Sequence, residues 1–257
     1  MIIDTHTHLY SEQFDEDREQ VLQRALTAGV SHFFLPAIDS SYTERMYAIE
    51  QQHPDKVHLM MGLHPSSVKE NYLEELQHVQ ANFKQRSFCA IGEIGIDLYW
   101  DRTFLPQQQD AFKTQIQWAK EKKLPIIIHC RDAFDEIFEI LESEKSPDLF
   151  GIFHCFTGTL TQAKQAISYN MKLGIGGVVT FKNGKIDTFL QQIDLKHLVL
   201  ETDAPYLAPA PHRGKRNESS YCTLVAEKLA TIYGCSYQEI CAQTSLNAAA
   251  VFSNIAL

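Results

Sequence analysis

The sequence predicts an α/β fold, a single-domain (β/α)8 TIM barrel that spans residues 1–257. Two observations lead to this prediction: eight short apolar runs recur along the chain, and their starts lie 23–37 residues apart. Eight strand–helix units of that size fill about 250 residues, the typical length of such a barrel. The runs occupy residues 2–9, 30–37, 57–64, 88–96, 125–130, 149–155, 172–179 and 197–203.

Each run resembles a parallel strand buried on both faces. The runs are rich in Val, Ile and Phe, and they are nearly continuous rather than alternating with polar residues. The alternative is a doubly wound sheet, but no Gly-rich phosphate loop follows the first run. No Pro-, Gly- or Ser-rich linker divides the chain, so we expect one domain.

Helical periodicity fills the gaps between the runs. Apolar residues from Phe134 to Leu141 recur at i, i+3, i+4 and i+7 and so form one helix face. Thr159 and Gln162 have the spacing of a capping box at a helix start. Helices are predicted around residues 134–141, 160–169, 220–233 and 236–255.

The charge and the apolar pattern exclude some classes of protein. The chain has 23 basic and 32 acidic residues, a net charge of −9, which disfavours coating of a phosphate backbone by bulk attraction. No run approaches the ~20 apolar residues of a membrane span. The N-terminus lacks a signal-peptide pattern, and the six cysteines form no Cys-x-x-Cys pair. We expect a cytoplasmic protein with no membrane contact and no obligatory protein partner.

Side chains of the types that bind metal ions fall at the C-terminal ends of five predicted strands. Those ends, with the loops that follow, build the active-site face of a barrel, so these side chains are expected to converge. In a His-x-His segment of a strand, both imidazoles point to the same face. The candidate metal ligands are His6, His8, Glu93, His129, His154 and Asp203.

This ligand set predicts two divalent metal ions. His6 and His8 would bind one ion with Asp203, while His129 and His154 would bind the second, with Glu93 between the two ions. Imidazole with carboxylate suits Zn²⁺ or Mn²⁺, whereas Mg²⁺ prefers carboxylates and water, and the sequence leaves these three open. Two ions ~3.5–4 Å apart lower the pKa of a shared water.

A second set of residues is predicted to bind substrate. Strand-end and loop cations can hold a phosphate, and arginine offers a bidentate fork for it. The basic cluster after the last strand is read either as such a contact or as an ordinary solvated loop. The substrate-binding candidates are His64 and Arg131 at strand ends, and Arg213, Lys215 and Arg216 in that loop.

Two smaller groups complete the predicted site. Asp4 and Glu201 share strand parity with His6 and Asp203, which would place them one layer deeper inside the barrel. The aromatic rings that follow strand-end motifs are expected either to stack nucleobases or to pack the loops. These rings are Tyr99, Trp100 and Tyr206.

Several motifs together resemble those of the TatD family of metal-dependent hydrolases, many of them described as DNases. They are Ile3-Asp-Thr-His-Thr-His8, Gly62-Leu-His-Pro65, Gly92-Glu-Ile-Gly-Ile-Asp97, His129-Cys-Arg131, His154-Cys-Phe-Thr-Gly158, Glu201-Thr-Asp-Ala-Pro205 and Arg213-Gly-Lys-Arg-Asn-Glu218. The resemblance implies the same six metal ligands. It also implies two catalytic residues: Asp203, which takes a proton from the attacking water, and Glu93, which replaces the carboxylated lysine of amidohydrolase relatives.

The resemblance implies a deoxyribonuclease, a 3′→5′ exonuclease that prefers single-stranded DNA and cleaves phosphodiesters with a two-metal-activated water. Fold and metal ions do not fix the scissile bond. Hydrolysis of an amide, ester or lactone in a small molecule is therefore the alternative. A non-catalytic metal-binding scaffold is a third interpretation, which the complete ligand set disfavours.

Overall fold

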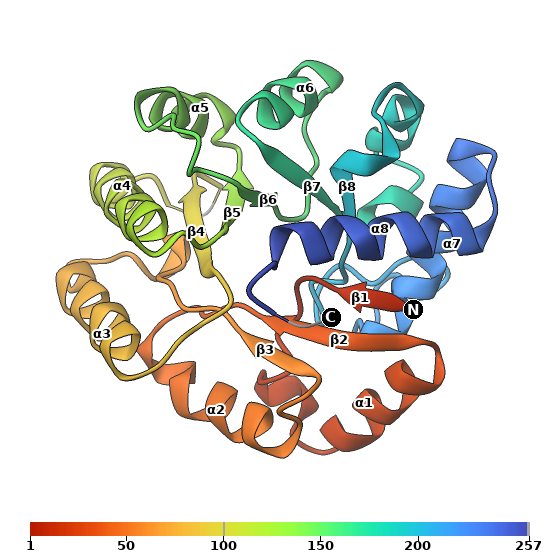
Figure 1. Cartoon of the computed structure of the whole chain (residues 1–257), viewed down its shortest axis with the longest axis horizontal. Coiled ribbons are helices and arrows are strands. Elements are labelled where there is room, and N and C mark those ends of the chain that lie inside the picture. Colours follow the sequence, from red (N-terminus) through yellow and green to blue (C-terminus); the bar gives the residue numbers. More distant parts are fainter. Residues whose placement is uncertain (100, 256–257) are drawn as a thin grey trace.

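The predicted barrel is confirmed. The structure is a computed structural model that describes residues 1–99 and 101–255, and these residues form a ring of parallel strands surrounded by helices (Figure 1). The strands are β1 (Ile2–Asp4), β2 (Val30–Leu35), β3 (Val57–Leu59), β4 (Ile91–Asp97), β5 (Ile126–Arg131), β6 (Gly151–Phe153), β7 (Met171–Ile175) and β8 (Leu198–Leu200).

Two junctions close the ring. The strands pair in the orders β1-β2-β3 and β4-β5-β6-β7-β8, and isolated parallel bridges join Met61 to Ile91 and Thr7 to Ala204. At the second junction the N–H of His8 donates to the carbonyl of Ala204 at 2.7 Å. Barrel closure therefore brings the residues that follow β1 beside those that follow β8.

Helices cover the outside of the strands, except between β7 and β8. In that stretch the described residues form only short 3-10 turns between Gly177 and His197, so one of the eight expected helices is absent there. The Thr159–Gln162 capping box opens α6 as predicted. The helices are α1 (Arg18–Thr27), α2 (Thr43–Gln52), α3 (Tyr72–Gln85), α4 (Leu105–Lys122), α5 (Phe134–Ser143), α6 (Leu160–Ser168), α7 (Cys222–Tyr233) and α8 (Tyr237–Val251).

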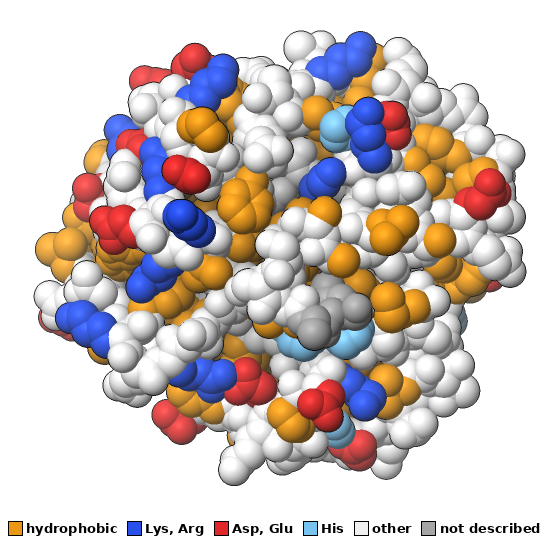
Figure 2. Space-filling view, viewed as in Figure 1, with side chains coloured by type: hydrophobic (Ala, Val, Ile, Leu, Met, Phe, Trp, Pro, Cys, Tyr) orange, Lys and Arg blue, Asp and Glu red, His pale blue; other side chains and the backbone are white. Residues whose placement is uncertain are grey.

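Helix α8 closes the N-terminal end of the barrel, and it crosses the ring in Figure 1. The amide of Asn247 donates to the carbonyls of Leu195 and Leu198, at the start of β8. Charged side chains of both signs lie around the margin of this face (Figure 2). Ala248, Val251 and Phe252 bury their side chains against the lowest layer of the interior. The opposite, C-terminal end is left for the functional site.

In β5, β6 and β8, side chains alternate between the inside and the outside of the barrel. The apolar layer above α8 includes Ile127, Ile152 and Val199. Two residues further on in β5, after β6 and after β8 stand His129, His154 and Glu201, which point to the same face because strand side chains alternate.

No helix among the described residues is long and apolar enough to cross a membrane.

Candidate metal centre

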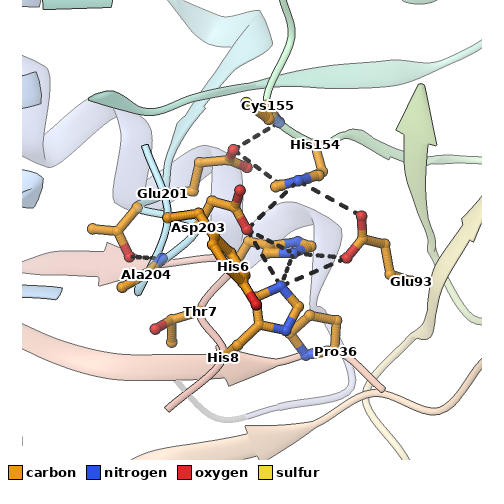
Figure 3. A network of polar contacts seen from close by, with 12 residues as sticks. His6, Thr7, His8, Pro36, Glu93, His154, Cys155, Glu201, Asp203 and Ala204 are labelled. Atoms are coloured by element: carbon orange, nitrogen blue, oxygen red, sulfur yellow. Dashed lines mark hydrogen bonds and ion pairs between the residues drawn. The ribbon is translucent and has the colours of Figure 1, made fainter. Parts of the chain in front are cut away.

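The six candidate ligands meet at the C-terminal end of the barrel, and Figure 3 shows five of them: His6, His8, Glu93, His154 and Asp203. The sixth, His129, contacts Glu93. Nε2 of His6 lies 3.3 Å from Nε2 of His8 and 3.1 Å from Oε2 of Glu93. Nε2 of His8 lies 3.3 Å from Oδ1 of Asp203. Nε2 of His154 lies 3.7 Å from Oε1 of Glu93 and 3.9 Å from Oδ1 of Asp203. With His129 on β5, side chains on or just after five strands thus form one compact donor set, and Glu93 lies within β4 rather than at its predicted end.

His64 joins this cluster through Glu93. Its Nε2 lies 3.3 Å from Oε1 of Glu93 and 3.2 Å from Nδ1 of His129, which itself lies 2.8 Å from the same Oε1. His64 was predicted to bind substrate, and it lines the cavity at this end of the barrel. The geometry also makes it a candidate metal ligand, because it offers a nitrogen to the same small space as two other donors.

The donors group differently from the predicted pairs. His154 lies against His6, with ring centroids 3.5 Å apart, whereas its ring is 6.4 Å from that of His129. The groups of donor atoms close enough to hold one ion are His6–His8–Asp203, His6–Glu93–His154, His64–Glu93–His129 and His154–Cys155–Glu201. Glu93, His6 and His154 each belong to two of these groups.

Two carboxylates outside the candidate set orient the imidazoles. Oδ2 of Asp97 lies 2.9 Å from Nε2 of His129, and Oε1 of Glu201 lies 3.1 Å from Nδ1 of His154. Asp97 accepts the ring N–H of His129, and Glu201 forms an ion pair with His154. Both carboxylates lie on the side of the imidazole that faces away from Glu93, an arrangement common behind metal-binding histidines. Asp97 was missed from the sequence, although its place as the last residue of β4 could have indicated it.

Asp4 and Glu201 have different outcomes. Glu201 faces the inside of the barrel, as predicted, but its carboxylate lies beside His154 rather than one layer deeper. Asp4 does not face the inside, because β1 ends at Asp4 and the strict alternation does not extend to His6. Its carboxylate instead accepts hydrogen bonds from the N–H and the hydroxyl of Thr202, at 3.0 and 2.7 Å. Asp4 therefore ties the start of the barrel to the segment that carries Asp203.

Charges in the cluster strongly perturb one another. Burial alone would raise the pKa of Glu93, but the surrounding histidines, His64 and His6 foremost, hold it well below its ordinary value. Burial alone would lower the pKa of His154, but Glu201, Glu93 and Asp203 outweigh it and raise that pKa to about 10. The carboxylates thus stay ionised and attract positive charge into a buried space.

The donor set fits divalent metal ions. Two imidazole nitrogens 3.3 Å apart, each also near a carboxylate oxygen, need a cation or a proton between them. Nδ1 of His6 is buried and has no hydrogen-bond partner among the described residues. Imidazole and carboxylate together suit Zn²⁺ or Mn²⁺, as the sequence indicated.

A cavity of about 850 Å³ opens above the cluster, and Arg213, Lys215 and Tyr206 line it. The guanidinium of Arg213 lies 3.7 Å from the ring centroid of Phe181. Arg131 also lines the cavity, and its guanidinium lies 3.7 Å from the ring centroid of Tyr99. Two arginine side chains thus make cation–π contacts near the mouth of this cavity.

Arg216 does not share this position. Its guanidinium makes two hydrogen bonds of 2.7 Å to the carboxylate of Asp17 and one to the carbonyl of Gln13. The ion pair satisfies the charge and turns the side chain toward the start of α1, so the structure does not support its predicted place among the substrate-binding residues. Trp100, proposed as a stacking ring, lies outside the described residues.

Known proteins match this sequence over nearly the whole chain. The family described as "TatD related DNase" matches residues 3–253. The metal-dependent hydrolase YabD of Bacillus subtilis, named as uncharacterized, is 39% identical over 98% of this chain and 99% of its own length. The 3′-5′ ssDNA/RNA exonuclease TatD of Erwinia tasmaniensis is 30% identical over 98% of this chain and 100% of its own length.

A solved structure agrees with the sequence matches. YjjV, a TatD homologue from Escherichia coli, superposes with a TM-score of 0.92 at 30% identity, and the match covers 98% of both chains. The barrel, the buried His/Glu/Asp cluster and the full-length family match lead to the same assignment. The chain belongs to the TatD family of metal-dependent hydrolases.

Proposed function

We propose that this protein is a 3′→5′ exonuclease that hydrolyses phosphodiester bonds of single-stranded DNA. Three features support the proposal: the donor set for divalent ions, the cations that share its cavity, and a relative named as a 3′-5′ ssDNA/RNA exonuclease. The observation that carries it is the position of Arg213 and Lys215.

Arg213 and Lys215 line the same cavity as Glu93 and Asp203. Among the described residues neither cation contacts a carboxylate, and Arg213 donates only to the neutral amide oxygen of Asn183, at 3.2 Å. Charged groups near the mouth of a cavity bind most strongly to ligands of opposite charge. A phosphate of the substrate supplies that charge, and the acidic protein gains a local site for a polyanion.

Asp203 is placed to act as the general base. Burial alone would raise its pKa, but His154 and His8 outweigh burial and lower it, so the carboxylate is ionised at neutral pH and can accept a proton. Its backbone φ of +58° is in the left-handed region that Asp rarely adopts, which costs energy and is typical of functional sites. Asp203 thus takes the proton of the attacking water.

The remaining residues position the reactants. His6, His8, Glu93, His154 and Asp203, with His64 and His129, would hold the metal ions. Divalent ions bound there lower the pKa of a water and neutralise charge on phosphoryl oxygens. Arg131 and Arg213 can each fork around a phosphate, and Lys215 adds a point charge. Together these groups hold the scissile phosphate beside Asp203.

Tyr206 supports a preference for single strands. Its ring is 47% exposed, lines the cavity and lies with its centroid 5.9 Å from that of His8. An unpaired base can stack on such a ring, a contact worth about 1–3 kcal/mol. A base inside an intact duplex cannot reach it without unpairing.

The test is a matrix of metals and substrates. Protein stripped with a chelator is reloaded with Mg²⁺, Mn²⁺ or Zn²⁺ and given 5′-labelled single-stranded DNA, duplex DNA, RNA or a simple lactone. We expect single-stranded DNA to shorten stepwise from its 3′ end, and a 3′-terminal phosphorothioate to block the shortening. Lactone hydrolysis without nucleotide release would instead establish the small-molecule alternative, and metal uptake without any turnover would establish a scaffold.

A further inference from the structure

A buried tyrosine outside the donor set contacts the outer nitrogen of His8. The hydroxyl of Tyr10 lies 2.6 Å from Nδ1 of His8 and 2.6 Å from the carbonyl oxygen of Pro36. The Tyr10 side chain is fully buried. Tyr10 therefore links a histidine of the cluster to the backbone after β2.

The chemistry of this chain of contacts permits one direction only. The Pro36 carbonyl has no proton, so the single hydroxyl proton of Tyr10 goes to it. Nδ1 of His8 must then donate its proton to the Tyr10 oxygen. In a neutral imidazole the other nitrogen, Nε2, is left with its lone pair, and this atom faces Oδ1 of Asp203 and Nε2 of His6 at 3.3 Å each.

A phenol keeps its proton at neutral pH, so the buried Tyr10 hydroxyl can donate to the Pro36 carbonyl. Asp97 and Glu201 are carboxylates behind His129 and His154, whereas the group behind His8 is neutral. His8 is therefore oriented without added negative charge.

We propose that Tyr10 is a positioning residue that fixes the tautomer and the ring orientation of His8, so that Nε2 is presented as a metal ligand. The inference rests on the proposed role of His8 in metal binding. Tyr10 touches neither substrate nor metal, and its effect passes through the imidazole.

The test compares Tyr10→Phe, Tyr42→Phe and His8→Gln with the unaltered protein. Tyr42 is the matched control. It is also a tyrosine, and its ring packs against that of Tyr10, with the two centroids 5.3 Å apart. Mn²⁺ binding to chelator-stripped protein is measured by calorimetry. Imidazole ¹⁵N NMR of the stripped protein reports which nitrogen of His8 carries the proton.

We expect the Nδ1–H form of His8 in the unaltered protein and in Tyr42→Phe, and a mixture of tautomers in Tyr10→Phe. We expect Tyr10→Phe to weaken the binding of one Mn²⁺ about 10–100-fold, and Tyr42→Phe to change it less than twofold. If Tyr10→Phe leaves the Mn²⁺ affinity unchanged while His8→Gln clearly lowers it, the role of Tyr10 is refuted and the proposed metal site stands. Unchanged affinity in His8→Gln would overturn the proposed metal site as well.

Discussion

The carboxylate of Glu201 and the imidazole of His154 form a buried pair, with Oε1 3.1 Å from Nδ1. Oε1 also accepts the backbone N–H of Cys155 at 2.6 Å, which holds the carboxylate in place. The pair leaves Nε2 of His154 turned toward Glu93 and Asp203 (Figure 3). Glu201 thus sets both the orientation and the charge of this histidine.

Replacing Glu201 with Gln tests this relationship. The amide oxygen can still accept the N–H of Cys155, but the negative charge beside His154 is lost. We expect the pKa of His154 in metal-free protein to fall from about 10 toward its ordinary range, and Mn²⁺ affinity to fall about 10-fold. An NMR pH titration and calorimetry measure the two effects. Glu227→Gln, an exposed change on α7, is the control, and a pKa unchanged by Glu201→Gln would refute the account of His154.

The raised pKa of His154 also predicts how stability depends on pH. Its pKa is about 10 in the folded protein and ~6.5 in an unfolded chain. The folded state therefore holds an extra proton between these values, so this stabilisation is complete below pH 6.5 and is lost as the pH rises toward 10. The expected slope is at most roughly 1 kcal/mol per pH unit.

Urea unfolding of chelator-treated protein at pH 7, 8 and 9 measures this slope. The measurements stop at pH 9, because burial also raises the pKa of Cys89 and Cys130. Above that pH these thiols ionise in the unfolded chain but not in the folded protein, which lowers the free energy of unfolding further. Glu201→Gln should flatten the dependence relative to the unaltered protein. A slope that is equal in both proteins would show that His154 is not its source.

Asn217 holds the turn that carries Asp203. Its side-chain amide donates to the carbonyls of Thr202 and Tyr206, at 2.8 and 2.7 Å, and its side-chain oxygen accepts the N–H of Glu218. Asn217→Ala leaves these buried groups unpaired, which should lower the free energy of unfolding by about 2–4 kcal/mol. Urea denaturation measures the change. Asn71→Ala, at an exposed position with no side-chain cap bond, should leave stability within ~0.5 kcal/mol, and equal stability of the two variants would contradict the assignment.

Arg213 and Arg216 lie three residues apart and should respond differently. Arg213→Gln removes a cation from the cavity, so we expect KM for a DNA oligonucleotide to rise about 10-fold or more, with thermal stability retained. Arg216→Gln breaks the ion pair with Asp17, so we expect a lower Tm and a KM within twofold. Steady-state kinetics and thermal unfolding separate the two effects. An equal rise of KM in both variants would return Arg216 to the substrate-binding set.

The sequence was most informative where strands are regular. Strand-end position indicated His129 and His154, and period-two alternation placed Glu201 on the inner face. All three follow by two residues the layer formed by Ile127, Ile152 and Val199. Alternation failed after β1, which is three residues long, and this is why Asp4 was assigned to the wrong side. Local patterns also gave the α6 capping box, whereas the 3-10 segment between β7 and β8 was not foreseen.

Contacts between distant segments could not be derived from one sequence. The pairing of Arg216 with Asp17 joins residues 199 positions apart, and nothing local distinguishes Arg216 from Arg213. The link from His8 through Tyr10 to Pro36 likewise depends on how the loop after β1 lies against the end of β2. Residue type and strand-end position indicated the donor set. They did not indicate how its members pair, and in the structure the ring of His154 stacks on that of His6 rather than on that of His129.

We propose that the Asp203 carboxylate and the surrounding donor set hydrolyse phosphodiesters of single-stranded DNA. The most direct measurement is nucleotide release from 5′-labelled single-stranded DNA by Mn²⁺-loaded protein, by Asp203→Asn and by the exposed control Asp148→Asn. We expect stepwise 3′→5′ shortening by the unaltered protein and the control, and at least a 100-fold loss in Asp203→Asn with its fold retained. Near-normal shortening by Asp203→Asn, or none by the unaltered protein with any of the three metals, would contradict the account.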